Sequence, residues 1–157
     1  MTRLIPMTVE QYDAWKADAL SAYAVDKERV LNIAPDAARD LALASFDGLL
    51  PDGMQTTDAH FYVIADDAGG PVGALWFSIR REWGQCECFV YDIVIDRDHR
   101  RHGHARAALE ALVPLAAELG ATKIGLHVFA DNPGAIALYE ACGFETKDLI
   151  MAKQVAL

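Results

Sequence analysis

The polar and apolar positions in the first third of the chain follow the period of α-helices. Thr8 and Gln11 fit a capping box, in which each side chain satisfies a free N–H group at a helix start. Beyond this start, apolar side chains recur on one helical face: Tyr12, Trp15, Ala19 and Tyr23. A second helix is predicted from Pro35 to about Phe46, because proline suits the first turn of a helix. Turn residues 49–53 then end it.

From His60 onward the pattern changes to the alternation that is typical of β-strands. Turns near Gly70 and Gly84 separate the apolar runs, as in an antiparallel meander. A short strand is also expected before the first helix, and two more are expected in the C-terminal third. The predicted strands are residues 3–6, 60–65, 72–80, 86–95, 123–129 and 147–155.

Two further helices are expected in the second half of the chain. One ends at Gly120 and contains Pro114. An interior proline costs about 3 kcal/mol, so a kink or a helix in two pieces is predicted there. The other helix begins with Asn132 as its N-cap and ends at Gly143. Residues 1–157 are therefore predicted to form a single mixed α/β (α+β) domain, with a mostly antiparallel sheet of about six to seven strands and about four flanking helices.

Length and composition also fit a compact globular protein. The chain has 157 residues with 53% hydrophobic content, and no apolar run reaches the roughly 18 residues that span a bilayer. The N-terminal stretch lacks the apolar core of a signal peptide, so a cytoplasmic protein without a membrane partner is expected. Three cysteines, an odd number, argue against a disulfide framework. No metal site is predicted, because no ligand set stands at a familiar spacing.

The net charge of −9 limits the classes of partner. Such acidity disfavours nucleic acid, because its phosphates carry the same sign of charge. It favours a cationic acceptor such as an amine, although acidity alone also keeps a protein soluble.

One segment departs from this acidity. Between Arg97 and Arg106 lie four of the 14 Lys and Arg residues and three of the five His. The segment follows an apolar strand and leads through Gly103 into a helix, whose first N–H groups have no partner within the helix. A strand, a glycine turn and a helix start surrounded by cations predict an anion site, and a pyrophosphate suits its several charges.

The same segment resembles the acetyl-CoA signature of the GNAT superfamily of N-acetyltransferases. That signature is Arg or Gln, two residues, Gly, one residue, and then Gly or Ala; residues 100–105 read Arg-Arg-His-Gly-His-Ala. The strand of residues 91–95 precedes it at the family's spacing, and a second family segment follows at residues 132–144. The resemblance covers about the C-terminal half of the chain. Arg97 and His104 depart from it, because the family often has a proline and an apolar residue there.

The resemblance implies the GNAT fold and acetyl-CoA as cosubstrate. The pantetheine arm would pair with the strand backbone like an added strand, and a bulge would free an N–H near Val94 or Ile95 to polarise the thioester carbonyl. Gly103 would permit close approach to the pyrophosphate, because a Cβ would block it. The expected cofactor-binding residues are Ile93, Val94, Ile95, Arg100, Arg101, His102, Gly103, His104, Ala105, Arg106 and Asn132.

Two residues have expected catalytic roles. Tyr139 matches the family's usual catalytic tyrosine, which protonates the departing thiolate; the alternative is a half-buried aromatic with a structural role. His127 sits five residues before Asn132, where some protein N-terminal acetyltransferases of the superfamily carry a glutamate base. Its ordinary pKa of about 6.5 suits base catalysis at neutral pH, although a lone strand histidine also serves structural roles. The rival bases on the central strand are Glu87, Tyr91 and Asp92. Asp92 could instead anchor a loop.

These inferences together predict an N-acetyltransferase that moves an acetyl group from acetyl-CoA to a primary amine by direct attack in a ternary complex. A covalent acyl-enzyme is disfavoured, because no cysteine has a convincing adjacent base. The expected acceptor is a small-molecule or peptide amine, bound by the N-terminal helices, residues 49–54, Trp76 and Phe77. A homodimer is compatible with the resemblance. The alternative is a non-catalytic acyl-CoA-binding module or sensor, which would not need Tyr139.

Overall fold

The computed structural model describes residues 1–156, which form one five-stranded sheet with helices on both of its faces. The strands lie in the order β1-β2-β3-β4-β5, and neighbours are antiparallel except for the parallel pair β4 and β5. The strands are β1 (Arg3–Pro6), β2 (Ala59–Ala65), β3 (Pro71–Glu82), β4 (Gln85–Ile95) and β5 (Lys123–Leu126).

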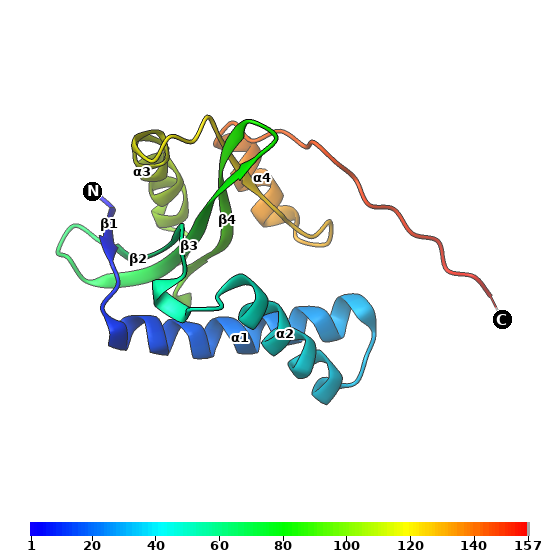
Figure 1. Cartoon of the computed structure of the whole chain (residues 1–157). Helices are drawn as coiled ribbons and strands as arrows, with labels where there is room; N and C mark the ends of the chain where they lie inside the picture. Colours follow the sequence, from blue (N-terminus) through cyan, green and yellow to red (C-terminus); the bar gives the residue numbers. More distant parts are fainter. Residues whose placement is uncertain (157) are drawn as a thin grey trace. The chain divides into compact units, whose positions relative to one another are not determined.

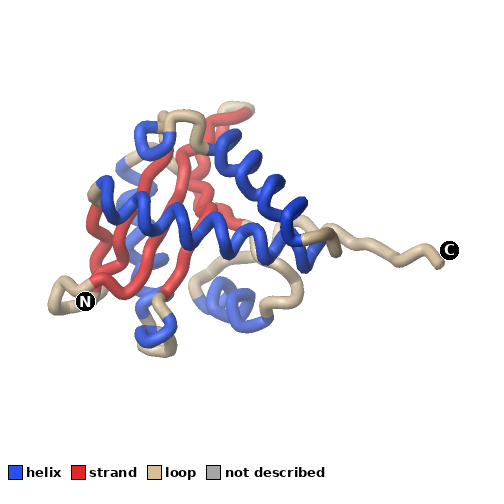
Figure 2. Tube along the Cα trace, turned by 90° about the horizontal axis from the view of Figure 1, so that it is seen from below, coloured by secondary structure: helices blue, strands red, loops and turns tan. Residues whose placement is uncertain are grey.

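Helices cover the two faces of the sheet. α1 (Val9–Leu31) and α2 (Pro35–Leu49) pack on one face, and α3 (His104–Glu118) packs on the other. Figure 1 shows α1 and α2 along one side of the strands, and Figure 2 shows a long helix crossing them. Two short 3₁₀ helices, η1 (Gly53–Gln55) and η2 (Arg97–His99), lie in the connecting loops.

The two faces have cores of different character. The core against α3 is mostly aliphatic and consists of Ile64, Val72, Leu75, Phe77, Ile79, Cys88, Val90, Ala108, Leu112 and Ala116. The core against α1 and α2, here called the aromatic cluster, is built on Tyr12, Trp15, Phe46, Phe61 and Trp76, with Tyr23 and Tyr91 packed against them. Trp76 and Phe77, expected together in one acceptor wall, therefore lie on opposite faces, because successive strand residues point to opposite sides.

Most predicted elements are confirmed. In the capping box, the Gln11 N–H donates to Thr8 Oγ1 at 3.2 Å and the Thr8 N–H donates to Gln11 Oε1 at 2.9 Å. β2, β3 and β4 form the predicted antiparallel meander. Gly120 and Gly143 follow α3 and α4 (Pro133–Ala141) with φ of +87° and +89°, the left-handed conformation that favours glycine after a helix.

The prediction is wrong for the C-terminal strands. Residues 1–156 contain five strands rather than six to seven, since β5 ends at Leu126 instead of Phe129 and no strand forms over residues 147–156. Leu149 in this segment is 78% exposed. An apolar, strand-like sequence becomes a strand only where a neighbouring strand supplies its hydrogen-bond partners.

α3 continues as one helix through Pro114, so of the two predicted alternatives the division into two pieces is wrong, and a kink stays a prediction. A proline at this position removes one backbone hydrogen bond. Leu112 and Ala116, on either side of it, are buried against the sheet. This packing outweighs the loss, because tertiary burial contributes most of the stability of a helix in a protein.

By its internal contacts the chain divides into two compact units, Met1–His127 and the segment from Val128 onward. The first contains the sheet with α1, α2 and α3. The second contains α4, which has no buried side chain. Among the described residues, no helix combines the length and the apolarity that crossing a membrane requires.

Candidate functional site

Strand β4 carries a bulge in its second half. Phe77 of β3 pairs with Val90, but the next pair is Trp76 with Asp92, so Tyr91 is an extra residue in β4. Such a bulge leaves one residue unpaired and interrupts the alternation of side chains. The bulge expected in this strand is therefore confirmed.

The bulge changes which face the β4 side chains occupy. Before it, Cys88 and Val90 pack in the core against α3, and after it Ile93 and Ile95 do so. The core-facing positions thus shift from even to odd numbers. Residues 91 and 92, between these pairs, both contact the face covered by α1.

The second half of β4 also has an open edge. β5 pairs with β4 only over residues 87–90, so no strand of the described chain pairs with residues 91–95 on that side. The Asp96 N–H donates to the Val72 carbonyl at 2.8 Å, and in an antiparallel ladder such pairs recur at every second residue. Odd positions 93 and 95 therefore direct their backbone N–H and C=O groups away from β3.

This alternation separates the two residues expected to polarise a carbonyl. Val94 lies opposite Ala74 at a position where the ladder directs its N–H to β3. Ile95 instead faces the open edge, and its carbonyl already accepts a hydrogen bond from Arg100 Nε at 2.9 Å. The N–H of Ile95 is the better placed donor.

The loop after β4 bends sharply before α3. Arg101 and Gly103 have φ of +65° and +80°, in the left-handed region that favours glycine. A Cβ added at Gly103 would meet no other protein atom within 4 Å. Glycine here therefore supplies a backbone conformation and leaves room for a ligand, rather than relieving a clash within the protein.

The start of α3 presents free backbone donors. Gly103 is the N-cap and offers no side chain, and the first bond to its carbonyl comes from the Ala107 N–H at 3.0 Å. The N–H groups of His104 and Ala105 precede this bond and have no acceptor within the helix. The first turn contains no acidic residue, so the positive end of the helix dipole remains available to an anion.

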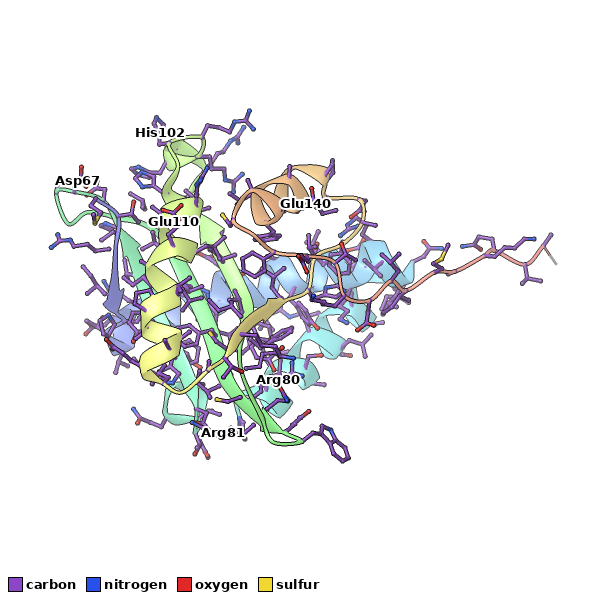
Figure 3. The ribbon with its side chains drawn as sticks, turned by 90° about the horizontal axis from the view of Figure 1, so that it is seen from above. Asp67, Arg80, Arg81, His102, Glu110 and Glu140 are labelled. Atoms are coloured by element: carbon purple, nitrogen blue, oxygen red, sulfur yellow. The ribbon has the colours of Figure 1, made fainter. Side chains whose placement is uncertain are left out.

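Positive side chains surround these donors. Four exposed arginines belong to this region: Arg97, Arg100, Arg101 and Arg106. Arg106 Nε also donates to Glu110 Oε1 on α3 at 3.0 Å. In Figure 3, His102 marks this end of the sheet and Arg81 marks the opposite end. Guanidinium groups and backbone amides together suit a phosphate-bearing ligand.

The histidines of the loop contact neighbouring residues. His104 Nδ1 lies 3.1 Å from Thr2 Oγ1, which ties the N-terminus to α3, and His102 Nδ1 lies 3.3 Å from the His99 carbonyl oxygen. The rings of His99 and His102 lie 6.5 Å and 6.2 Å from the ring of His104. His104, which replaces an apolar residue of the family pattern, thus has a structural contact of its own.

Asn132 and Tyr139 belong to the second unit. The Ala135 N–H donates to Asn132 Oδ1 at 3.2 Å, so the predicted N-cap is confirmed. The ring of Tyr139 lies 5.8 Å from the ring of Phe144 in an edge-on arrangement, and the Phe144 N–H donates to the Tyr139 carbonyl at 3.0 Å. These contacts hold the tyrosine in place on α4, and its catalytic role stays a prediction.

His127 does not lie on a strand. β5 ends one residue earlier, at Leu126, and the His127 side chain is exposed. The strand alternation that would direct its side chain away from the neighbouring apolar residues therefore does not apply. Its role as a base stays a prediction.

Two of the rival bases on β4 are occupied by neighbours. The Glu87 carboxylate lies 3.3 Å from Lys123 Nζ and 3.8 Å from Arg80 Nε. The ring of Tyr91 stacks on Trp76 with centroids 4.7 Å apart. Both side chains are therefore already engaged by neighbours within the protein.

Asp92 is a different kind of carboxylate. Its Oδ2 accepts a hydrogen bond from Trp15 Nε1 at 2.8 Å, and no cation of residues 1–156 pairs with it. Burial raises the pKa of Asp92; the Trp15 hydrogen bond lowers it in part, and the like charge of Asp26 raises it. A raised pKa makes a carboxylate a better proton acceptor near neutrality.

From the sequence, Asp92 is only one of three rival bases and Trp15 is only a core residue. A sequence signal for the bulge was present, because the apolar positions change from even to odd numbers. They are Cys86, Cys88, Val90, Ile93 and Ile95. The pairing of Trp15 with Asp92 spans 77 residues, and no local pattern could reveal it.

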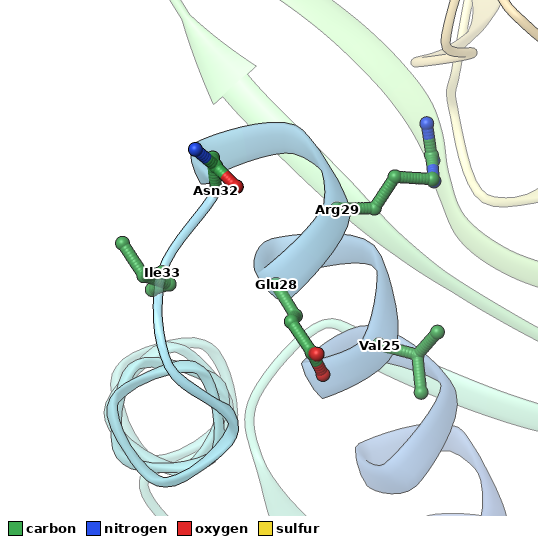
Figure 4. Close-up of a pocket in the computed structure, with 5 residues that line it drawn as sticks. All are labelled: Val25, Glu28, Arg29, Asn32 and Ile33. Carbon is green, nitrogen blue, oxygen red and sulfur yellow. The ribbon is translucent and has the colours of Figure 1, made fainter.

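Two surface pockets of the described chain lie apart from these residues. One, of about 360 Å³, is at the C-terminal end of α1 (Figure 4). It is lined by Val25, Glu28, Arg29, Asn32 and Ile33. The other, of about 290 Å³, is lined by residues of the β3–β4 turn. Neither contains Asp92 or a residue of the segment 96–106, here called the arginine-rich loop, so neither is assigned a part in binding.

Two relatives by sequence carry acetyltransferase names. The chain is 34% identical to an uncharacterized N-acetyltransferase, YycN, of Bacillus subtilis (strain 168), over 97% of each chain. The crystal structure of YycN matches with a TM-score of 0.93 at 33% identity, over 100% of each chain. A 58-residue stretch, 37% of this chain and 39% of the other, is 41% identical to the [ribosomal protein bS18]-alanine N-acetyltransferase of Escherichia coli (strain K12).

A more distant structure shares the fold. It is AAC(6')-Iy in complex with the bisubstrate analog CoA-S-monomethyl-acetylneamine, with a TM-score of 0.64 at 17% identity over 100% of this chain and 99% of the other. Residues 19–144 match the acetyltransferase (GNAT) family, and this match spans most of the sequence. The chain is therefore an acetyltransferase and belongs to the GNAT family.

Proposed function

We propose that this acetyltransferase moves an acetyl group from acetyl-CoA to a primary amine. The observation that carries the proposal is the continuity of the open β4 edge, residues 91–95, with the backbone amides of His104 and Ala105 at the start of α3. The amide groups of a pantetheine arm would pair with Ile93 and Ile95, as in strand addition. The backbone amides and the arginines that follow this strand in the chain would hold the pyrophosphate and the remaining phosphate of the coenzyme.

The relatives support both substrates. The AAC(6')-Iy structure contains a bisubstrate analog in which CoA is joined to acetylneamine. This supports acetyl-CoA as the donor and an amine as the acceptor. The stretch shared with the bS18-alanine N-acetyltransferase supports a peptide amine as one acceptor class, beside small-molecule amines.

In the proposed reaction the neutral amine attacks the thioester carbonyl directly, in a ternary complex. The Ile95 N–H donates to the carbonyl oxygen as negative charge develops there. When the C–S bond breaks, the Tyr139 hydroxyl gives its proton to the thiolate. The sequence assigns the removal of the ammonium proton to His127.

The test is release of free CoA thiol from acetyl-CoA over a panel of amines, including peptides with an N-terminal alanine, polyamines and aminoglycosides. Tyr139→Phe should lower turnover by about 100-fold or more, the contribution of a general acid, while CoA affinity is retained. A hundredfold excess of CoA over its Kd should stabilise both proteins by about 2.7 kcal/mol. If CoA binds but no amine supports thiol release, the chain is a binding module or sensor and the proposal is wrong.

A further inference from the structure

Asp92 and Trp15 form a contact between two elements that the sequence keeps far apart. Trp15 lies on α1 and is buried, and its Nε1 donates to Asp92 Oδ2 on β4 at 2.8 Å. The bulge at Tyr91 places Asp92 on the α1 face, opposite Trp76 in the register. One edge of the carboxylate is thus held by an indole, while no hydrogen bond or ion pair within residues 1–156 occupies Oδ1.

The rings around Trp15 hold it firmly. Its centroid lies 5.5 Å from that of Trp76 and 5.3 Å from that of Phe61, and both pairs are tilted or edge-on. Such packing leaves the indole little freedom to turn, so its N–H direction is set by the aromatic cluster.

The surroundings of Asp92 are nearly free of positive charge. The indole N–H is its one hydrogen-bond donor in the described chain, and Asp26 adds a like charge. The titratable side chains within the aromatic cluster are Tyr12, Tyr23 and Tyr91, and the Lys27 ammonium lies over the outer ring, that of Tyr23, at 5.0 Å from its centroid. α2 and β3 add the rings of Phe46 and Trp76. A partly buried carboxylate in such a place lacks the neutralising partner that a structural ion pair would have.

We propose that Asp92 receives the ammonium group of the acceptor and takes its proton, and that Trp15 is a positioning residue that orients Asp92. This inference rests on the proposed function and replaces His127 as the base. Oδ1 of the carboxylate takes one proton from R–NH₃⁺, which leaves R–NH₂ with a free electron pair. The new C–N bond forms, the C–S bond breaks, and the thiolate receives the proton of the Tyr139 hydroxyl. The nitrogen then loses its second proton to solvent, and solvent returns a proton to Tyr139. Asp92 then returns its proton to water.

The test compares two buried tryptophans. Trp15→Phe and Trp76→Phe both remove an indole from the same cluster, but only Trp15 Nε1 has a hydrogen-bond partner, since Trp76 Nε1 has none in residues 1–156. Loss of a hydrogen bond to a carboxylate should raise its pKa, so the acidic limb of kcat/KM against pH should move up by about one unit in Trp15→Phe. In Trp76→Phe the acidic limb should stay at the wild-type pH, even if the maximal value of kcat/KM changes.

Asp92→Asn, which preserves shape, provides the second measurement. It should lower kcat by about 100-fold or more, leave CoA affinity within twofold, and remove the acidic limb. If Asp92→Asn keeps the wild-type profile, or if both tryptophan variants move the limb equally, the inference is overturned while the proposed function stands. If His127→Ala alone removes the limb, His127 is the base and the inference is again overturned. Absence of thiol release in the wild-type protein would instead contradict the proposed function.

Discussion

The arginine-rich loop of residues 96–106 closely follows Asp92 in the chain, yet it differs from the Asp92–Trp15 pair in almost every physical respect. The loop exposes four arginines and presents backbone N–H groups at the start of α3. The pair consists of one carboxylate and one indole among packed rings. The first region suits an anion of several charges, and the second suits a single cation.

This contrast shows that binding depends on the backbone in the loop and on a side chain at Asp92. Backbone amides do the binding in the loop, so the conformation matters more there than any one exposed side chain, whose charge solvent and salt screen. At Asp92 one side chain carries the interaction, and burial strengthens the electrostatic effect of every neighbour. Substitutions should therefore act through backbone geometry in the loop and through side-chain chemistry at Asp92.

The largest expected effect on coenzyme binding comes from the backbone of the loop. Gly103→Ala should weaken CoA binding at least about tenfold, because alanine resists a φ of +80° and its Cβ would enter the open space left for the ligand. Gly84→Ala is a matched control, since Gly84 has φ of +74° and equally open surroundings in the β3–β4 turn. Both variants should lose about 1–2 kcal/mol of stability, measured by chemical denaturation.

Isothermal titration with CoA distinguishes the two glycine variants by their affinity for the coenzyme. Gly84→Ala should bind CoA like the wild-type protein despite its lower stability. Equal affinity of Gly103→Ala and Gly84→Ala would show that the loop conformation does not matter for the coenzyme, and the contrast between the two regions would fail.

The loop and the Asp92–Trp15 pair also differ in how well the sequence predicts them. The glycine turn at Gly103 that leads into α3, the N-caps Thr8 and Asn132, and the glycines after α3 and α4 are local signals, and the structure has each as predicted. Coenzyme binding by residues 100–105 stays a prediction. The segment 147–155 also has a local signal, but a strand depends on a partner strand that no local pattern supplies.

The Asp92–Trp15 pair is non-local in the same sense. The phase change between Val90 and Ile93 indicates a bulge, but the identity of the helix residue that meets Asp92 depends on how α1 crosses the sheet. Side-chain spacing within α1 predicts only that Trp15 faces the core. The chemistry that depends on tertiary contact is therefore the part that sequence patterns leave open.

A smaller effect is expected on stability, with a definite dependence on pH. Burial raises the pKa of Asp92 in the folded state, so the stability associated with its protonated form is complete below the unfolded pKa and is lost as pH rises through the folded pKa. Asp92→Asn mimics the protonated form at every pH. The variant should match the wild-type melting temperature at pH below about 3.9 and exceed it by a few degrees at pH 7.

The control for this pH series is Asp13→Asn, which removes the same charge from an exposed position on α1. Its melting temperature should follow that of the wild-type protein across the series, apart from the small effect of net charge. A gain of the same size for Asp13→Asn would mean that general repulsion in an acidic chain, rather than burial at Asp92, limits the stability.

The smallest expected effect concerns a second polar atom of the aromatic cluster. Tyr12 Oη is buried and has no hydrogen-bond partner within residues 1–156, whereas the Trp15 indole nearby is fully used. Removal of an unpaired buried hydroxyl costs no hydrogen bond, so Tyr12→Phe should change the free energy of unfolding by less than about 0.5 kcal/mol, or raise it slightly. Trp15→Phe should lose more than about 1 kcal/mol in the same urea titration, because it leaves a buried carboxylate without its donor. Similar costs for the two variants would mean that packing alone, and not the hydrogen bond to Asp92, explains why Trp15 is where it is.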